Sequence, residues 1–213
     1  KRLVLRYLTL AYAHLDVSGV KHATRVMTIN EGTAHWVKEV YGVEPSRSLL
    51  GVDTERFSPR AGDPAFQALR ARYRGRKIII HSTDFTPLKR TWDAVHIVET
   101  IRRDVPEVKL LITYSFASMK EVGRLQRYLK KRGLEDHVEI LGFVEHKELP
   151  YYYSLADAGL YTGIGSGASA ASLFVLECMA CGTPVVRTHF THEEVEHGAT
   201  GFLYDPREKE AAR

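Results

Sequence analysis

The sequence predicts an α/β protein built on a doubly wound, Rossmann-like parallel sheet. From residue 77 onward, strand-like runs alternate with helical patterns, which is the order of a parallel sheet with helical crossovers. The runs at 78–80 (Ile-Ile-Ile) and 110–112 (Leu-Leu-Ile) are apolar on both faces. Strands that are covered by helices on both sides have this composition.

The residues before 77 predict smaller elements and a linker. Residues 3–15 form an amphipathic helical pattern, and residues 25–29 are a short β-rich run. Asn30 is a plausible N-cap for a helix over 31–41. Residues 51–59 are rich in Gly, Pro and Asp, which is typical of a crossover linker, and a basic stretch over 70–77 leads into the main domain.

The main domain predicts six strands and four helices. The expected strands are 77–82, 109–114, 138–144, 158–161, 184–188 and 201–204, and the expected helices are 92–101, 118–131, 149–155 and 173–181. Ligands of such sheets bind at the carboxyl ends of the strands. We therefore expect the functional residues just after the strands.

Composition narrows the class of protein. The 213 residues are 44% hydrophobic and 26% charged, which excludes a disordered, collagen-like or coiled-coil chain. Two cysteines exclude a disulfide framework and favour reduced thiols. The formal net charge of +4 suits anionic ligands such as phosphates without choosing among them.

The N-terminus has some features of a signal peptide. Lys1 and Arg2 precede an apolar stretch, and residues 11–13 (Ala-Tyr-Ala) resemble a cleavage site. Arg6 interrupts that stretch, however, and there is no initiator methionine. We therefore favour an amphipathic helix in a cytoplasmic protein, and we expect the chain to be a piece of a longer one.

Two patterns resemble metal sites but favour other roles. Cys178 and Cys181 form a C-x-x-C pair without a second ligand pair, so packing is the favoured role. His192 and His197 flank acidic residues, as in a zinc protease motif. They are five residues apart, about 140° off one helical face at roughly 100° per residue. No metal is therefore expected.

The glycine-rich and basic segments are ambiguous. Residues 163–167 (G-I-G-S-G) do not fit the spacing of a dinucleotide loop, although a flexible loop facing phosphate oxygens stays open. The basic clusters at 70–77 and 130–132 favour a solvated surface over a nucleic-acid interface.

Three residues are stronger candidates for ligand binding. Lys89 and Arg90 follow the first expected strand of the main domain, where two cations would stabilise a diphosphate. The alternative is a solvated N-terminal turn, but cations oppose the dipole of a helix N-terminus, so a functional role is an equal alternative. Glu177 lies inside an apolar helical pattern, where a carboxylate needs a partner, so we favour a ligand contact.

Five segments, in order, resemble motifs of the retaining glycosyltransferases of family 4 (glycosyl transferases group 1), which have the GT-B fold. The segments are 51–59 (G-V-D-T-E-R-F-S-P, against G-V-D-x-x-x-F-x-P), 87–90 (P-L-K-R, against P-x-K-G or P-x-K-R), 141–157 with L-G-F-V, Leu149 and L-A-D (against G-x-V … L … A-D), 176–186 (L-E-C-M-A-C-G-T-P-V-V, against E-A-M-A-x-G-x-P-V-V) and 198–203 (G-A-T-G-F-L, against G-x-T-G-x-L).

The resemblance implies two Rossmann-like domains around a cleft, a nucleotide-sugar donor such as a UDP or GDP sugar, and no required metal or other cofactor. Residues 1–55 would be the end of the N-terminal domain with the linker, and residues 56–213 the donor-binding domain, truncated at its C-terminus. The acceptor site and the catalytic histidine would lie in the missing N-terminal part. Full-length relatives often act on lipid-linked acceptors, so peripheral association with the inner face of the membrane stays open.

The resemblance also assigns roles to single residues. Lys89 matches the lysine that contacts the donor diphosphate, with Arg90 beside it. Glu177 matches the second glutamate of an E-x7-E motif, which holds the ribose. The other matches are Phe143 and Val144 at the base, the amides of Ser172 and Leu173 at a phosphate, and Glu193 in a less certain role.

The chain departs from the family pattern at two important positions. Ser169 stands where the first glutamate of E-x7-E is expected, and Asp84 stands where the family has a phosphate-binding arginine. These departures leave a second hypothesis open, a non-catalytic nucleotide-sugar-binding module or pseudoenzyme. A Rossmann dehydrogenase and a nucleic-acid binder are remote alternatives.

Overall fold

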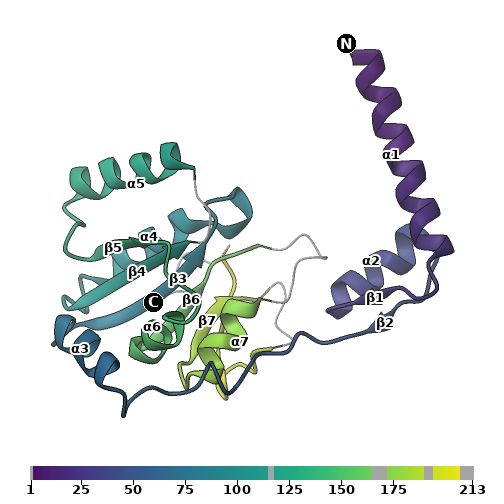
Figure 1. The fold of residues 1–213 in the computed structure, drawn as a ribbon. Helices are drawn as coiled ribbons and strands as arrows, with labels where there is room; N and C mark the ends of the chain where they lie inside the picture. The colour runs from purple at the N-terminus through teal and green to yellow at the C-terminus, as the bar shows by residue number, and fades with distance from the viewer. Residues whose placement is uncertain (1, 115–117, 165–171, 190–193, 207–213) are drawn as a thin grey trace. The chain divides into compact units, whose positions relative to one another are not determined.

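The computed structural model in Figure 1 describes residues 2–114, 118–164, 172–189 and 194–206, with the backbone alone for residues 2–11. The chain divides into two compact units between Leu50 and Gly51. Each unit is described below by itself.

The first unit contains two helices and a pair of very short strands. Its elements are α1 (Arg2–His22), β1 (Met27–Thr28), α2 (Glu31–Tyr41) and β2 (Ser46–Arg47). The strands β1 and β2 pair in parallel, and the hydroxyl of Tyr41 donates a hydrogen bond to Asp16 over 2.5 Å, which joins α2 to α1. The expected helix over 3–15 is thus the first part of a longer helix.

The second helix begins where its capping residue predicts. The side chain of Asn30 accepts a hydrogen bond of 2.7 Å from the amide of Thr33. At the other end Gly42 adopts a left-handed conformation with φ of 66°, which glycine allows at little cost, and its amide donates to the carbonyl of Lys38. The prediction of Asn30 as N-cap is confirmed.

The second unit is a doubly wound parallel sheet, as predicted. Its strands are β3 (Lys77–Thr83), β4 (Val108–Tyr114), β5 (Val138–Gly142), β6 (Ala158–Tyr161), β7 (Val185–Thr188) and β8 (Gly201–Tyr204). They lie in the order β5-β4-β3-β6-β7-β8, and each neighbouring pair is parallel.

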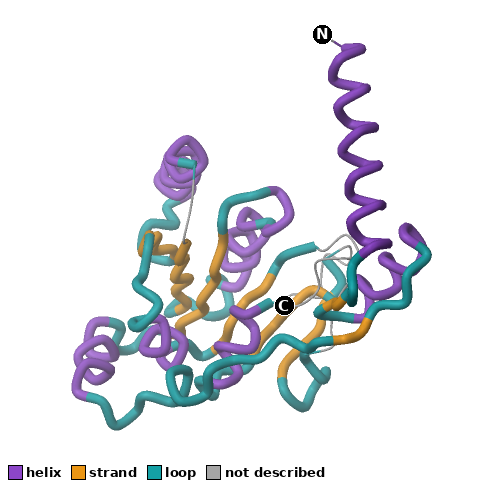
Figure 2. The backbone as a smooth tube through the Cα atoms, turned by 45° about the vertical axis from the view of Figure 1, so that its right-hand side comes forward, coloured by secondary structure: helices purple, strands orange, loops and turns teal. Residues whose placement is uncertain are grey.

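Helices cover both faces of this sheet (Figures 1 and 2). The helical elements are α3 (Pro64–Arg72), the 3₁₀ turn η1 (Pro87–Lys89), α4 (Thr91–Ile101), α5 (Met119–Arg132), α6 (Leu149–Leu155) and α7 (Leu173–Ala180). Residues of α4 and α5 pack with Leu110, Ile112 and Leu160 in one core. Residues of α6 and α7 pack with Ile80 and Leu111 in the other. This two-sided burial explains why the runs at 78–80 and 110–112 are apolar on both faces.

The chain reverses its direction of winding at β3. From β3 it passes outward to β4 and β5, and it then returns to pair β6 with the opposite edge of β3. The carboxyl ends of β3 and β6 therefore flank the switch point of the sheet. Ligands of open α/β sheets bind in the crevice at this position.

In the second unit, helix α3 and the strand expected over 138–144 differ from the sequence prediction. Helix α3 was not predicted, although its start has a clear signal: Asp63 accepts a hydrogen bond of 2.8 Å from the amide of Ala65, and Pro64 occupies the first turn. The strand expected over 138–144 ends at Gly142, whose φ of 82° turns the chain away. Phe143 follows with 67% of its surface exposed.

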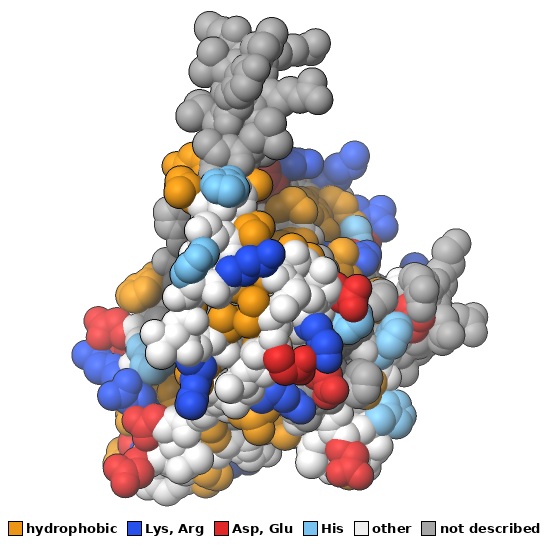
Figure 3. Space-filling model, turned by 90° about the vertical axis from the view of Figure 1, so that its right-hand side faces the viewer, with side chains coloured by type: hydrophobic (Ala, Val, Ile, Leu, Met, Phe, Trp, Pro, Cys, Tyr) orange, Lys and Arg blue, Asp and Glu red, His pale blue; other side chains and the backbone are white. Residues whose placement is uncertain are grey.

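One face of the molecule carries charges of both signs. On the face drawn in Figure 3, Lys and Arg side chains are interspersed with Asp and Glu side chains. In the part of the chain that the structure describes, no helix is long and apolar enough to cross a membrane.

Candidate functional site at the switch point of the sheet

Lys89 lies at the end of η1, and this turn is attached to the carboxyl end of β6. The hydroxyl of Thr162 donates a hydrogen bond of 2.8 Å to the carbonyl of Lys89. The amide of Ile164 donates to the carbonyl of Leu88 over 2.9 Å. The ammonium of Lys89 lies 5.4 Å from the centre of the Tyr161 ring, a cation–π distance. The structure thus places the predicted cation at the switch point.

Asp84 is engaged within its own turn. Its carboxylate accepts a hydrogen bond of 2.9 Å from the amide of Thr86 and one of 2.7 Å from the hydroxyl of the same residue. Burial acts to raise the pKa of Asp84, but these hydrogen bonds and the charge of Lys89 outweigh it, so the pKa is lowered. The carboxylate is therefore ionised at neutral pH, and it adds negative charge on the side of Lys89.

Arg90 has a local partner. It adopts a left-handed backbone conformation with φ of 48° before α4, and its Nε lies 2.5 Å from the carboxylate of Asp93 in the first turn. Asp93 offsets the unfavourable interaction of a cation with the helix dipole. The charge placement that favoured a ligand role for Arg90 therefore has an explanation within the protein.

Glu177 is buried in α7, with 8% of its surface exposed, and it has partners. The Nε2 of His146 lies 3.6 Å from its carboxylate, and the side chain of Tyr153 forms a hydrogen bond with it. Burial raises the pKa of Glu177, while His146 and Tyr153 act in the opposite direction. The expectation that this carboxylate needs a partner is met inside the chain.

His146 joins Glu177 to two other segments. The guanidinium of Arg56 lies 3.0 Å from Nδ1 of His146, and the ring of Phe57 packs edge-on against the imidazole at 5.1 Å. Because arginine only donates, Nδ1 accepts, and the neutral ring carries its proton on Nε2, facing Glu177. His146 also belongs to the segment that follows Phe143 and the half-buried Val144. The structure thus brings Glu177 close to the loop that the resemblance assigns to the base.

Ser172 and Leu173 begin α7, as expected for residues at its N-terminus. Leu173 is 49% exposed, whereas Ser172 is buried. The amide of Ser172 donates a hydrogen bond of 3.1 Å to Oε1 of Glu194. The carboxylate of Glu194 thus lies where the helix dipole favours an anion.

Sequence reasoning missed Arg187 and Glu194. Arg187 is completely buried at the carboxyl end of β7, and its Nη1 pairs with Oε2 of Glu194. A signal was present, since a charged residue within the run V-V-R-T of a buried strand requires a partner. The glutamate singled out in this segment was Glu193, which lies outside the described residues, as does Ser169.

A buried histidine lies under the site. His81 on β3 is 1% exposed, and its Nδ1 lies 2.9 Å from the carbonyl of Leu160 on β6. Burial lowers the pKa of His81 to about 4. The imidazole is therefore neutral at physiological pH and adds no charge beneath Lys89.

Both cysteines of the C-x-x-C pair lie in the core of the second unit. Cys178 and Cys181 are free and buried, and burial raises the pKa of both thiols, that of Cys181 to about 11. Among the described residues, no group of three or more His, Cys, Asp or Glu side chains could hold a metal ion. These observations agree with a packing role for the C-x-x-C pair.

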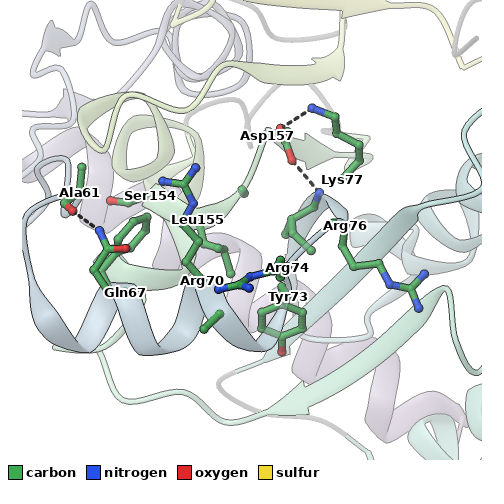
Figure 4. A pocket seen from close by; sticks show the side chains of 15 residues that line it. Ala61, Gln67, Arg70, Tyr73, Arg74, Arg76, Lys77, Ser154, Leu155 and Asp157 are labelled. Atoms are coloured by element: carbon green, nitrogen blue, oxygen red, sulfur yellow. Dashed lines mark hydrogen bonds and ion pairs between the residues drawn. The ribbon is translucent and has the colours of Figure 1, made fainter.

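A cavity of about 700 Å³ lies away from this site, at the amino end of β3 (Figure 4). Arg70, Arg74, Lys77 and Asp157 are among its lining residues, and Lys77 pairs with Asp157 over 3.3 Å. Helices α3 and α6 both end at this cavity, so their negative dipole ends account for the cations. The sequence placed this basic stretch in a linker, whereas its first residues form the last turn of α3.

The fold is a doubly wound α/β domain, with a cation and a helix N-terminus near the switch point of its sheet. Residues 65–213 match the family described as "Glycosyl transferases group 1". The chain belongs to this family.

Two curated relatives are each 30% identical to the chain. One is a GDP-mannose-dependent alpha-(1-6)-phosphatidylinositol monomannoside mannosyltransferase of Mycolicibacterium smegmatis, matched over 76% of this chain and 43% of its own length. The other is an N-acetyl-alpha-D-glucosaminyl L-malate synthase of Bacillus anthracis, matched over 60% of this chain and 32% of its own. The chain therefore spans less than half the length of either relative.

Solved structures share the fold. The HepE protein of Anabaena in complex with UDP and glucose superposes with a TM-score of 0.78 at 21% identity, over 91% of this chain and 53% of that one. The C-terminal domain of a glycosyl transferase group 1 protein of Francisella tularensis superposes with a TM-score of 0.59 at 21% identity, over 74% of this chain and 81% of that one. At this identity the likeness establishes the fold alone.

Proposed function

We propose that the chain is the donor-binding part of a retaining glycosyltransferase of family 4 type, which binds a nucleoside diphosphate sugar and transfers the sugar to an acceptor. The observation that carries the proposal is the position of Lys89 beside Tyr161 at the switch point of the sheet. Membership of the family and the two curated relatives, both named as sugar-transferring or sugar-joining enzymes, support it.

The proposed mechanism assigns each residue one role. Negative charge grows on the leaving nucleoside diphosphate as the bond to the sugar breaks, and Lys89 and the amides at the start of α7 would stabilise that charge without a metal or other cofactor. Glu177 would accept hydrogen bonds from the ribose and thereby orient the donor. Phe143 and Val144 would contact the base.

The acceptor would be held by a second domain, of which residues 1–55 are the end. On this proposal the 213-residue chain binds the donor but transfers no sugar by itself, because no general base is assigned within it. The protein would act in the cytoplasm, and peripheral contact with the inner face of the membrane would bring it to a lipid-linked acceptor.

A second candidate function is a nucleotide-sugar-binding module that has lost catalysis. Ser169 in place of a glutamate and Asp84 in place of an arginine favour it, because the proposed donor site then lacks a sugar-contacting carboxylate and a phosphate-binding cation. Ser169→Glu discriminates between the two functions. Unchanged affinity for a nucleotide sugar in this variant favours an enzyme with an altered site, and a gain of affinity favours the degenerate module.

The first test is calorimetric titration of the chain with UDP, GDP and ADP. We expect one of the three to bind, and we expect Lys89→Ala and Glu177→Ala each to weaken that binding about tenfold or more, because each removes one charged contact. Lys77→Ala is a matched control, since Lys77 pairs with Asp157 at the amino end of β3, away from the candidate site. Binding that is insensitive to both site variants would contradict the proposed site.

A further inference from the structure

Arg187 is a fully buried cation in the second unit. None of its surface is exposed, and it occupies the third position of β7, whose carboxyl end lies beside that of β6. Burial of a charged group in a sheet is costly unless the charge is paired. An apolar residue would fill such a position at less cost, so the guanidinium requires an explanation.

The carboxylate of Glu194 connects Arg187 to the start of α7. One oxygen, Oε2, pairs with Nη1 of Arg187, and the other, Oε1, accepts the amide hydrogen of Ser172 at 3.1 Å. The side chain of Glu194 is 12% exposed. A single anionic group thus bridges a buried guanidinium and a helix N-terminus, two donors that also suit a phosphate.

Arg187 and Lys89 converge on one aromatic ring. The guanidinium carbon of Arg187 lies 5.2 Å from the centre of the Tyr161 ring, and the ammonium of Lys89 lies 5.4 Å from the same point. Arg187 therefore lies near Lys89 at the switch point, although it comes from a different strand than the segment that carries Lys89. Asp84, which lies on the Lys89 side, reduces the net positive charge there.

We propose that Arg187 is a phosphate-binding residue of the donor site, and that the carboxylate of Glu194 holds the place of a donor phosphate until the diphosphate displaces it. The inference rests on the proposed function. A phosphate offers more oxygens and more charge than a carboxylate to the same guanidinium and amide, so the exchange is favourable in the presence of donor. The energy needed to displace Glu194 lowers the net affinity.

The inference predicts opposite effects on diphosphate binding when the charge of Glu194 or that of Arg187 is removed. A purely structural ion pair does not predict this difference. Glu194→Gln keeps the size of the side chain and can still accept from Arg187, but it removes the competing charge. We expect it to tighten diphosphate binding. Arg187→Met removes the cation and is expected to weaken diphosphate binding. The double variant Arg187→Met/Glu194→Leu replaces the pair by apolar residues and leaves no buried charge unpaired.

The test is calorimetric titration of the 213-residue chain and these three variants with UDP and GDP, and with uridine and guanosine as probes without phosphate. We expect Glu194→Gln to bind the preferred diphosphate about fivefold more tightly than the unmodified chain. Arg187→Met and the double variant are expected to bind it at least about tenfold more weakly. Affinity for the nucleoside is expected to stay unchanged in all three, and circular dichroism confirms that the double variant is folded.

Each remaining outcome overturns the inference. If Glu194→Gln weakens binding as much as Arg187→Met does, the pair has a structural role only. The same holds if the double variant binds the diphosphate as tightly as the unmodified chain. If Lys89→Ala abolishes binding while the Arg187 and Glu194 variants change nothing, the proposed function stands and this inference fails. If neither the unmodified chain nor Glu194→Gln binds any diphosphate, both fail.

Discussion

Three buried polar side chains of the second unit belong to the candidate site or lie next to it. His81, Glu177 and Arg187 each have less than a tenth of their surface exposed, and each has a partner that belongs to another element or loop. The sequence singled out Lys89 and Glu177 as candidates because they stand out against their surroundings. Arg187 stands out as well, but its partner is seven residues away in a loop, where no periodicity applies and adjacent glutamates are equivalent in sequence.

His81 makes stability depend on pH. Its pKa is lowered from 6.5 to about 4 by burial, so the unfolded chain binds the proton more readily than the folded one. This histidine therefore does not change the free energy of unfolding above pH 6.5. It lowers that free energy by about 3 kcal/mol as the pH falls towards 4. Urea unfolding at several pH values gives the free energy of unfolding of the wild type and of His81→Gln. The loss is measured as the difference between their slopes of this free energy against pH.

The control for this prediction is His137→Gln. The Nδ1 of His137 lies 3.0 Å from the carbonyl of Val108, a contact similar to that of His81, but the ring is only half-buried. We expect the control to follow the wild-type pH dependence. Parallel slopes for the wild type and His81→Gln between pH 6.5 and 4 would contradict the prediction.

At the scale of elements, the sequence predicted helices and strands with strong local signals and missed a helix whose signal was weak. The strands at 158–161 and 201–204 have the predicted bounds because apolar runs and turn residues define them on both sides. Helix α3 was missed because its second half is basic and resembles a solvated linker. Its apolar anchor, Phe66, is a single buried residue, so tertiary packing and the Asp63 cap rather than periodicity specify this helix.

The cap of α2 allows a quantitative test. Asn30→Ala removes the acceptor of the Thr33 amide and is expected to reduce helix stability by about 1 kcal/mol. Hydrogen exchange of the α2 amides measures this change. Ser118→Ala is the comparison, because Ser118 precedes α5 without a side-chain cap hydrogen bond and should cost clearly less there. Equal losses at the two helices would show that the cap does not stabilise α2.

At the scale of the whole molecule, the fold class followed from the sequence but the strand order did not. Alternating elements specify parallel strands, and right-handed crossovers restrict the topology, but several orders satisfy both conditions. Strand β3 is central because it lies between β4 and β6. The apolar run I-I-I was the sequence feature that indicated this position. The site lies at the switch point for the same reason, since only the strand order defines where that point is.

The second unit is expected to fold without the first. Phe57 is 2% exposed and packs with Tyr153 in the core of the second unit, so the chain from Gly51 onward carries its own anchor. We expect a chain of residues 51–213 to keep a cooperative thermal transition and the α/β circular dichroism spectrum. In that chain Phe57→Ala should lower the free energy of unfolding by about 3–5 kcal/mol. A non-cooperative melt of residues 51–213 would contradict this prediction.

The two buried thiols at α7 allow the opening of this helix to be measured by thiol labelling. Cys178 and Cys181 lie on the helix and its end that also carry Glu177, and both are buried and hard to ionise. A thiol reagent can reach them only when α7 separates from the sheet. The rate of thiol labelling therefore reports how often α7 opens, and a bound nucleotide is expected to slow this labelling.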